Sequence, residues 1–181
     1  MELLKEVEPK LTRAAILRPA ARGAAPAGGA ANDLFIKETE VPARALGIQL
    51  LSVMVGGSDD FEGAFRTITK ERANGLLMRL PAFVYSAGQL KRVAELAAKN
   101  RLPSIANATR WVDAGGLMSY GADPNFSYYR AAMYVDKILK GTKPADLPVE
   151  APMKFELVIN LKTANALGLT IPPIVLMRAQ K

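Results

Sequence analysis

The sequence contains neither cysteine nor histidine among its 181 residues. Without cysteine there are no disulfides, thiolate nucleophiles or thiolate metal ligands. Without histidine the commonest general base and the commonest metal ligand are missing as well. A cation would have to be held by oxygen ligands, and no EF-hand-like loop is present. We therefore expect a protein that is not an enzyme and has no metal or other cofactor.

Long apolar runs are also missing. No run approaches the ~20 residues that a membrane-spanning helix needs. The first ten residues, MELLKEVEPK, mix charged and apolar positions, which is not the pattern of a secretory signal peptide. If Met1 is the true start, the sequence predicts a cytoplasmic chain.

Signals for nucleic-acid and nucleotide binding are weak. The net charge is +7, but the 24 basic residues are dispersed, whereas nucleic-acid binders usually carry a clustered basic stripe. Gly23 and Gly28 have the spacing of a phosphate-binding loop, but Gly29 and Ala30 follow where Lys and Ser or Thr are required. We expect no nucleic-acid partner and no nucleotide.

Half of the residues are apolar, enough for one compact domain with a core. Four β-rich segments are expected as strands, and segments with helical periodicity lie between them. This alternation predicts an α/β fold with a doubly wound parallel sheet. The expected strands are residues 14–17, 48–55, 75–80 and 103–106.

Helix ends carry local signals. Asn32 or Asp33 is expected to cap a helix that runs to Leu46, with a kink or interruption near Val41 because Pro42 lies inside it. Capping-box spacing marks two further helix starts, Asp59 with Glu62 and Ser86 with Gln89. The apolar positions expected to face the core are Phe61, Ala64, Phe65 and Ile68 in the first of these helices and Leu90, Val93 and Ala97 in the second.

After Asn107 the pattern changes. TRWVDAGG is expected as a short helix or turn, LMSYG as a strand, and a longer helix then ends at Gly141. LKGTKPADLPVEAP is rich in proline and is expected to be an extended connection between two packing units. KFELVINL is expected as a strand, and a short helix after it is stopped by Gly168 and Pro172.

The ordered blocks AGGLMSYG, YVDKILKG, TKPADLPVE and KFELVINLKTANALGLTIPP closely resemble the C-terminal part of the solute-binding proteins of ABC transporters, in the tryptophan-type family. The resemblance implies a two-lobed type I periplasmic-binding fold. It places residues 1–106 in the second lobe, residues 107–143 with the first lobe, and residues 144–181 as a return strand and helix to the second lobe. The opening sheet of the first lobe has no counterpart, which implies an N-terminally truncated chain.

The same resemblance implies a small-molecule solute such as an amino acid, an ABC membrane permease as partner, and a periplasmic location. The alternative is a lone lobe that keeps the fold and a partner surface but does not sequester a ligand. A missing first lobe would leave an apolar face exposed, with Tyr129, Met133 and Ile138 as candidates, so we also expect self-association.

Candidate ligand-binding residues follow the strands, because ligands of parallel sheets bind beyond the carboxyl ends of the strands. Phe83 and Tyr85 could stack on a solute or simply cover the sheet edge. Asn107 could hydrogen-bond the solute or cap a turn. Arg110 could pair with a carboxylate or be a surface charge, and Trp111 is favoured as a core anchor. The remaining candidates are the hydroxyl groups of Ser119 and Tyr120.

Overall fold

The computed structural model describes residues 1–19, 29–79 and 86–179. Its centre is one six-stranded sheet with the order β2-β1-β3-β4-β5-β6. The first five strands are parallel, and β6 pairs antiparallel with β5. The strands are β1 (Arg13–Pro19), β2 (Gln49–Val55), β3 (Gly75–Met78), β4 (Ser104–Ala106), β5 (Met118–Ala122) and β6 (Phe155–Ile159).

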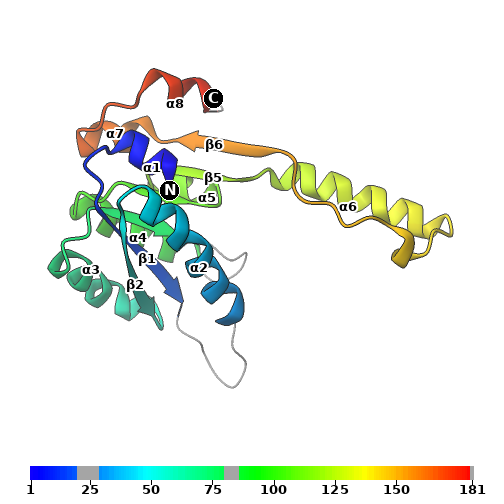
Figure 1. The fold of residues 1–181 in the computed structure, drawn as a ribbon, viewed down its shortest axis with the longest axis horizontal. Helices are drawn as coiled ribbons and strands as arrows, with labels where there is room; N and C mark the ends of the chain where they lie inside the picture. Colours follow the sequence, from blue (N-terminus) through cyan, green and yellow to red (C-terminus); the bar gives the residue numbers. More distant parts are fainter. Residues whose placement is uncertain (20–28, 80–85, 180–181) are drawn as a thin grey trace.

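The predicted doubly wound sheet is confirmed, with a correction at its last strand. After β5 the chain runs outward through a long helix and turns back, so that β6 enters the sheet from the end at which β5 left it (Figure 1). A connection that leaves and re-enters the sheet at the same end joins antiparallel strands. A parallel pair would need a crossover connection that brings the chain back to the opposite end of the sheet. A strand was predicted here, but its direction relative to β5 was not.

Helices cover both faces of the sheet, as their side chains in two separate core clusters show. Ala15 and Leu17 of β1 belong to one cluster and Ala14 to the other, as expected when side chains alternate between faces. The first face is covered by α3 (Phe61–Lys70), α4 (Ala87–Lys99) and α5 (Arg110–Asp113). The second is covered by α1 (Glu2–Val7), α2 (Gly29–Ala45), α7 (Leu161–Leu167) and α8 (Pro173–Arg178).

The predicted start of α4 is confirmed. The Ser86 hydroxyl accepts from Gln89 N at 3.2 Å, and Gln89 Oε1 accepts from Ser86 N at 2.8 Å. This reciprocal pair satisfies two amide donors that the first turn of a helix leaves unpaired. All the apolar positions predicted to face the core in α3 and α4 are buried.

The predicted capping box of Asp59 with Glu62 is wrong. A 3₁₀ turn, η1 (Ser58–Asp60), precedes α3, and Asp60 at the N-cap position makes no side-chain cap. Its Oδ2 instead accepts from Gly56 N at 2.7 Å. Glu62 pairs with Arg92 of α4, which lowers the pKa of the Glu62 carboxyl chiefly through the hydrogen bond. Asp59 lies inside this turn, so the N-cap position falls one residue later than predicted, and the expected partner Glu62 is bound by another helix.

Helix α2 also departs from expectation. It begins at Gly29, so Asn32 and Asp33 lie inside it rather than at its cap, and it continues past Pro42 to Ala45 without interruption. Pro42 stands close to the end of the helix, and its own carbonyl still accepts from Leu46 N at 3.1 Å. Helix α8 was not predicted.

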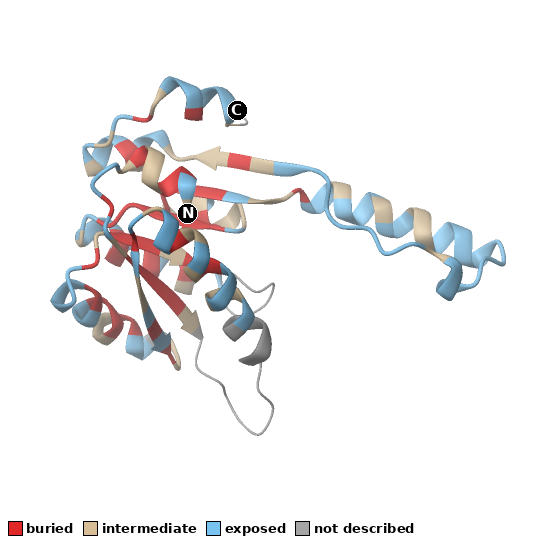
Figure 2. Ribbon diagram, viewed as in Figure 1, coloured by how far each residue is buried: buried red, intermediate tan, exposed pale blue. Residues whose placement is uncertain are grey.

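One part of the chain stands apart from the sheet. Helix α6 (Pro124–Leu139), the 3₁₀ turn η2 (Pro144–Asp146) and the extended return segment project away from it (Figures 1 and 2). We call residues 124–153 the arm and the other described residues the body. No residue of α6 is buried. Residues 107–122, assigned to the first lobe from the resemblance, lie in the body as α5 and β5, while the assignment of α6 to another lobe stays a prediction.

Candidate functional site

A small hollow lies where β4 and β5 reach the carboxyl edge of the sheet. Its volume is about 110 Å³, and we call it the edge hollow. It contains two of the predicted ligand-binding residues, Asn107 and Ser119. Its lining consists of Asn107, Ala108, Thr109, Ser119, Gly121, Ala122, Pro124 and Glu156.

The strand register decides which side chains face the edge hollow. Gly121 of β5 pairs with Glu156 of β6 across the antiparallel ladder. Ser119 lies two residues before Gly121 and therefore points to the same side of the sheet. This register brings together a hydroxyl, a glycine and a carboxylate from two strands.

Tyr120 lies on the opposite side of the sheet from Ser119. There its ring stacks on Phe155, with ring centroids 5.6 Å apart and an interplanar angle of 19°. Tyr120 is 44% exposed. The structure does not bring the two predicted hydroxyl groups to one site.

The Ser119 hydroxyl is enclosed but unpaired. Ser119 is 1% exposed, and its Oγ has no hydrogen-bond partner within the described parts of the chain. A buried hydroxyl without a partner costs ~1–3 kcal/mol. Ser104, equally buried on β4, illustrates the usual solution, since its Oγ accepts from Leu117 N at 3.2 Å. Ser119 is thus a lining residue of the edge hollow whose buried hydroxyl can still accept or donate a hydrogen bond.

Gly121 allows the Asn107 loop to approach β5 closely. A Cβ atom at this position would lie 2.0 Å from the Asn107 carbonyl oxygen, which a rigid backbone cannot accommodate. A glycine inside a strand often marks such a close approach. That signal was available in the sequence at MSYGA, but nothing in the sequence linked it to Asn107.

An ion-pair chain borders the edge hollow at the base of the arm. Lys154 Nζ lies 2.7 Å from Asp123 Oδ2 and 3.7 Å from Glu156 Oε1. The hydrogen bond from Lys154 lowers the pKa of the Asp123 carboxyl and raises that of the Lys154 ammonium. Asp123 also caps α6 by accepting from Asn125 N and Phe126 N, so Lys154 connects the cap of the arm with Glu156 in the edge hollow.

The other predicted residues lie outside the edge hollow or outside the described residues. Arg110 is the first residue of α5, is half-buried, and does not line the hollow. Phe83 and Tyr85 fall outside the described residues. Trp111 is fully buried in the core cluster on its face of the sheet, so its interpretation as a core anchor is confirmed. Glu156 was missed, because a single glutamate in a strand carries no sequence signal for a site.

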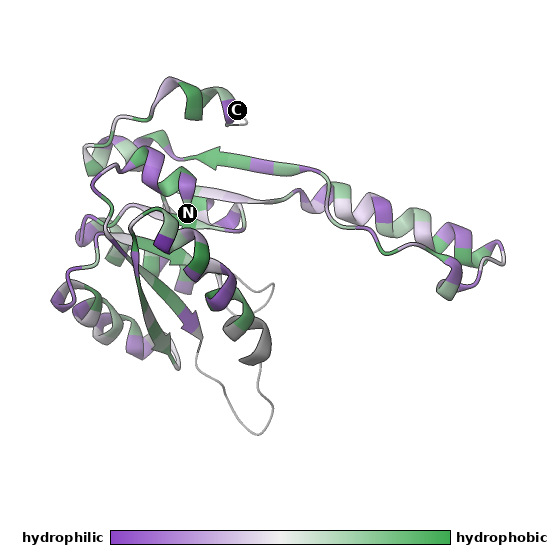
Figure 3. Ribbon diagram, viewed as in Figure 1, coloured by the Kyte–Doolittle hydropathy of each residue, from purple (hydrophilic) through white to green (hydrophobic). Residues whose placement is uncertain are grey.

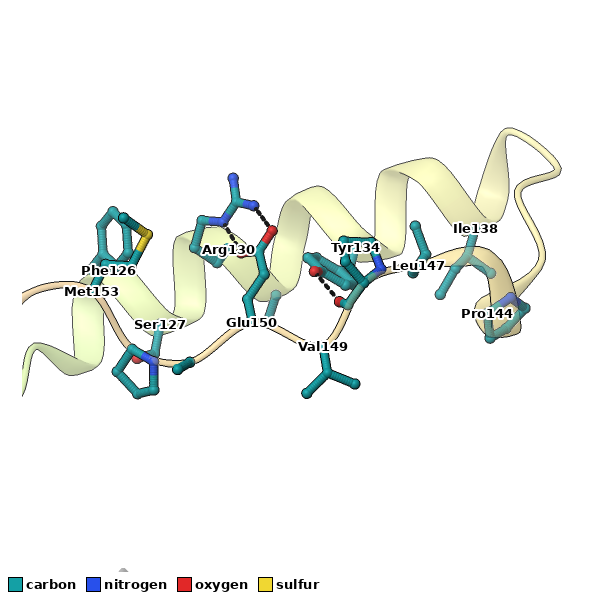
Figure 4. A pocket seen from close by; sticks show the side chains of 14 residues that line it. Phe126, Ser127, Arg130, Tyr134, Ile138, Pro144, Leu147, Val149, Glu150 and Met153 are labelled. Carbon is teal, nitrogen blue, oxygen red and sulfur yellow. Dashed lines mark hydrogen bonds and ion pairs between the residues drawn. The ribbon is translucent and has the colours of Figure 1, made fainter.

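A larger groove, of about 460 Å³, lies on the arm between α6 and the return segment (Figure 4). Its polar groups are already paired: Arg130 Nε donates to Glu150 Oε2 at 2.8 Å, and Tyr134 Oη donates to the Pro148 carbonyl oxygen at 2.5 Å. The bond from Arg130 lowers the pKa of the Glu150 carboxyl. These contacts fasten the return segment to α6, and they leave the smaller edge hollow as the better candidate for a polar ligand.

The described part of the chain contains neither a cluster of metal-ligating side chains nor a membrane-spanning helix. Across residues 1–19, 29–79 and 86–179, no three acidic side chains gather in a way that could hold a metal ion. No helix there is both long and apolar enough to span a membrane.

Comparison with known proteins gives a consistent result. A Vibrio cholerae conserved domain protein has 28% identity and a TM-score of 0.81, covering 99% of this chain and 57% of its own. A Streptococcus pneumoniae ABC domain, solved in complex with L-Trp, has 25% identity and a TM-score of 0.81, covering 98% and 57%. A tyrosine-binding protein of Clostridioides difficile is 31% identical over 77 residues, which are 42% of this chain and 22% of the relative.

The chain therefore spans little more than half the length of these solved structures. The family model described as ABC transporter substrate binding protein matches residues 1–181. The resemblance inferred from the ordered C-terminal blocks is thereby confirmed. By this match over its whole length, the chain belongs to the ABC transporter substrate-binding protein family.

Proposed function

We propose that this chain is a solute-binding component of an ABC-type importer and that its ligand is an amino acid or a similar small molecule. The observation that carries the proposal is the edge hollow at the carboxyl edge of the sheet, which is lined by the Glu156 carboxylate and by Ser119, whose buried hydroxyl has no partner among the described residues. Parallel sheets bind ligands at this edge. The L-Trp complex of the Streptococcus pneumoniae structure and the name of the tyrosine-binding relative support an amino acid as the ligand.

The ligand is held, in this proposal, between the body and a second α/β unit that packs on the arm. A hollow of about 110 Å³ takes only a small group, whereas ligand sites usually bury 70–90% of the ligand surface. The second wall comes from further residues of the same protein or from another chain. Ligand binding then favours the closed arrangement of the two units because both walls contact the ligand.

The arm supports this arrangement. Hydrophobic residues alternate with hydrophilic ones along α6 (Figure 3), and none of them is buried. Tyr128 is 75% and Leu139 81% exposed. Of the three residues predicted to form the apolar face, Tyr129 and Ile138 are exposed and Met133 is half-buried, with its sulfur 3.4 Å from Arg130 Nη1. Such a face is typical of a surface that another unit covers.

Family membership also supports a location outside the cytoplasm and a membrane permease as partner. The closed form of the two units would be the form that the permease recognises.

Isothermal titration calorimetry against the common amino acids and small organic acids tests the proposed function. We expect one class to bind with ~1:1 stoichiometry and a dissociation constant near the micromolar range, about −8 kcal/mol. Far-ultraviolet circular dichroism of the same sample verifies folding. A folded chain that binds no member of the panel would contradict solute binding by this chain and favour the alternative, a lone lobe that keeps only an interaction surface.

Self-association through the exposed apolar face of the arm is a further expectation. Sedimentation equilibrium should show association of the wild type that weakens about tenfold, or ~1.4 kcal/mol, when Tyr128→Ser and Leu139→Lys are combined. Lys91→Ser on α4, an exposed position of the body, serves as the control. A wild-type chain that stays monomeric at high concentration would contradict self-association.

A further inference from the structure

We propose that the edge hollow is a subsite for a primary ammonium group, held by the Glu156 carboxylate and the Ser119 hydroxyl. The inference rests on the proposed function and deepens it, since it says which end of an amino acid enters the body. It also makes a claim about a bare alkylammonium ion, which can be tested without knowing the solute.

The charges around the edge hollow decide whether a cationic or an anionic ligand group binds there. Among the described residues that line the edge hollow, Glu156 alone carries a charge. Asp123 and Glu156 together carry two negative charges, and Lys154, which contacts both, supplies one positive charge. This cluster therefore has a net negative charge, which attracts a cation and repels a carboxylate.

Lys154 leaves hydrogen-bond acceptor positions of the Glu156 carboxylate unoccupied. Its Nζ donates to Asp123 Oδ2 at 2.7 Å but stays 3.7 Å from Glu156 Oε1, beyond ordinary hydrogen-bond length. A carboxylate has about four lone-pair positions, so a second ammonium can bind to Glu156 beside Lys154.

The hydrogen-bond inventory fits an ammonium group as well. An ammonium offers three donors and no acceptor, so it requires acceptors on several sides. Glu156 offers carboxylate oxygens, and the Ser119 Oγ lies unpaired among the described residues on the same side of the sheet. The Asn107 carbonyl oxygen lies against Gly121 at the same hollow.

The size of the hollow limits what enters. About 110 Å³ is less than the roughly 150 Å³ of a cavity that takes up benzene, so a small head group fits the hollow better than an aromatic ring does. The side chain and carboxylate of an amino acid would remain outside the hollow, facing the second unit. Side-chain selectivity would then be set elsewhere, whereas the amine would be required of every ligand.

Nuclear magnetic resonance titration with methylammonium chloride tests the subsite directly. Sodium chloride at equal ionic strength is the reference. We expect the Thr109, Ser119 and Gly121 amide signals to shift and saturate in the wild type. The dissociation constant for methylammonium obtained from these shifts should rise at least tenfold in Glu156→Gln and about threefold in Ser119→Ala. It should be unchanged in Glu95→Gln, a matched change of an exposed glutamate on α4. Absence of methylammonium-specific shifts in the folded wild type overturns the subsite, whatever the solute.

Calorimetry separates this inference from the proposed function. L-tryptophan and L-tyrosine are compared with indole-3-propionate and 3-(4-hydroxyphenyl)propionate, which lack the amine. We expect at least tenfold weaker binding of the deaminated acids, and a loss of that preference in Glu156→Gln. Equal binding of amino acid and deaminated acid would overturn the subsite while leaving solute binding intact. Methylammonium shifts without any amino-acid binding would support the subsite and contradict the proposed function.

Discussion

The body and the arm contain similar apolar side chains and are stabilised in different ways. In α3 of the body, Phe61, Phe65 and Ile68 are all buried against the sheet. In α6 of the arm, tyrosine, valine, isoleucine and leucine side chains are present, but none is buried. Burying one large apolar side chain contributes ~1.5–3 kcal/mol, so the hydrophobic effect stabilises the body and contributes little to the arm.

The arm is held by local polar contacts instead. Asp123 caps α6, Arg130 and Tyr134 fasten the return segment, and Asp136 pairs with Lys140 at 2.9 Å. Exposed contacts of this kind are individually weak. An apolar sequence therefore does not by itself indicate where a core lies, because a core forms only where a second apolar surface packs on the first.

The largest test of this comparison replaces one aromatic residue in each region. Trp111→Ala should lower the free energy of unfolding by ~3–5 kcal/mol, because it empties a fully buried site. Tyr128→Ala on the arm should change it by less than ~0.5 kcal/mol. Urea denaturation should be followed by circular dichroism, since Trp111 is the sole tryptophan of the chain. Similar losses in the two variants would mean that the arm is part of the folded core.

A second test concerns backbone approach in the body. Gly121→Ala should cost ~1–3 kcal/mol, because its Cβ would lie 2.0 Å from the Asn107 carbonyl oxygen and the strand or loop must shift. Ligand binding at the edge hollow should weaken at least tenfold. Gly63→Ala in α3 is the control, since the nearest atom would be 3.9 Å away and alanine favours a helix by ~0.5–1 kcal/mol. Retained binding in folded Gly121→Ala would contradict the placement of the ligand.

A third test uses pH at the junction of body and arm. The hydrogen bond from Lys154, with those from the Asn125 and Phe126 amides, lowers the pKa of Asp123. The stabilisation of α6 should therefore be complete above the ordinary pKa of aspartate, about 3.9, and be lost as the pH falls through the lower folded value. Amide exchange at Asn125 and Phe126 between pH 6 and 3 measures it.

Two variants separate the cap from the charge in this test. Asp123→Asn keeps a good N-cap residue and removes the ion pair, so its amide protection should be reduced at neutral pH and nearly independent of pH. Asp123→Ala removes both and should expose the first turn of α6 at every pH. An unchanged acid response in Asp123→Asn would show that another group titrates.

The smallest effect is expected within the arm itself. Arg130→Gln should leave the urea midpoint of the body unchanged, because the pair with Glu150 is partly exposed and both residues belong to the arm. Amide exchange of residues 147–153 should accelerate, because the return segment loses its fastening to α6. A lowered midpoint would indicate that the arm and the body unfold as one unit.

Local features were predictable wherever the signal and its partner lie within one turn of chain. The Ser86 and Gln89 cap and the buried face of α3 are of this kind. Asp59 and Glu62 have the same spacing, but Asp59 lies inside the 3₁₀ turn before α3 and Glu62 bonds Arg92 on another helix. Spacing predicts a capping box only where the first residue takes the N-cap position and no tertiary partner competes for the second.

The candidate site was predictable in part for a similar reason. Asn107 and Ser119 were expected because they follow or occupy strands near the carboxyl edge. Tyr120 was expected with them, but the two-residue alternation of a strand places it on the other face. Glu156 and Gly121 reach the site through the pairing of β5 with β6, which joins residues 35 positions apart in the chain.

The α/β class, most of the strands and the family follow from the sequence alone, because these depend on composition, periodicity and ordered blocks along the chain. The tertiary structure decided the antiparallel direction of β6, the exposure of α6 and the meeting of Ser119, Gly121 and Glu156. Each of these depends on which distant segment supplies the neighbouring surface. Such a choice is made by packing across the whole chain, and no window of sequence contains it.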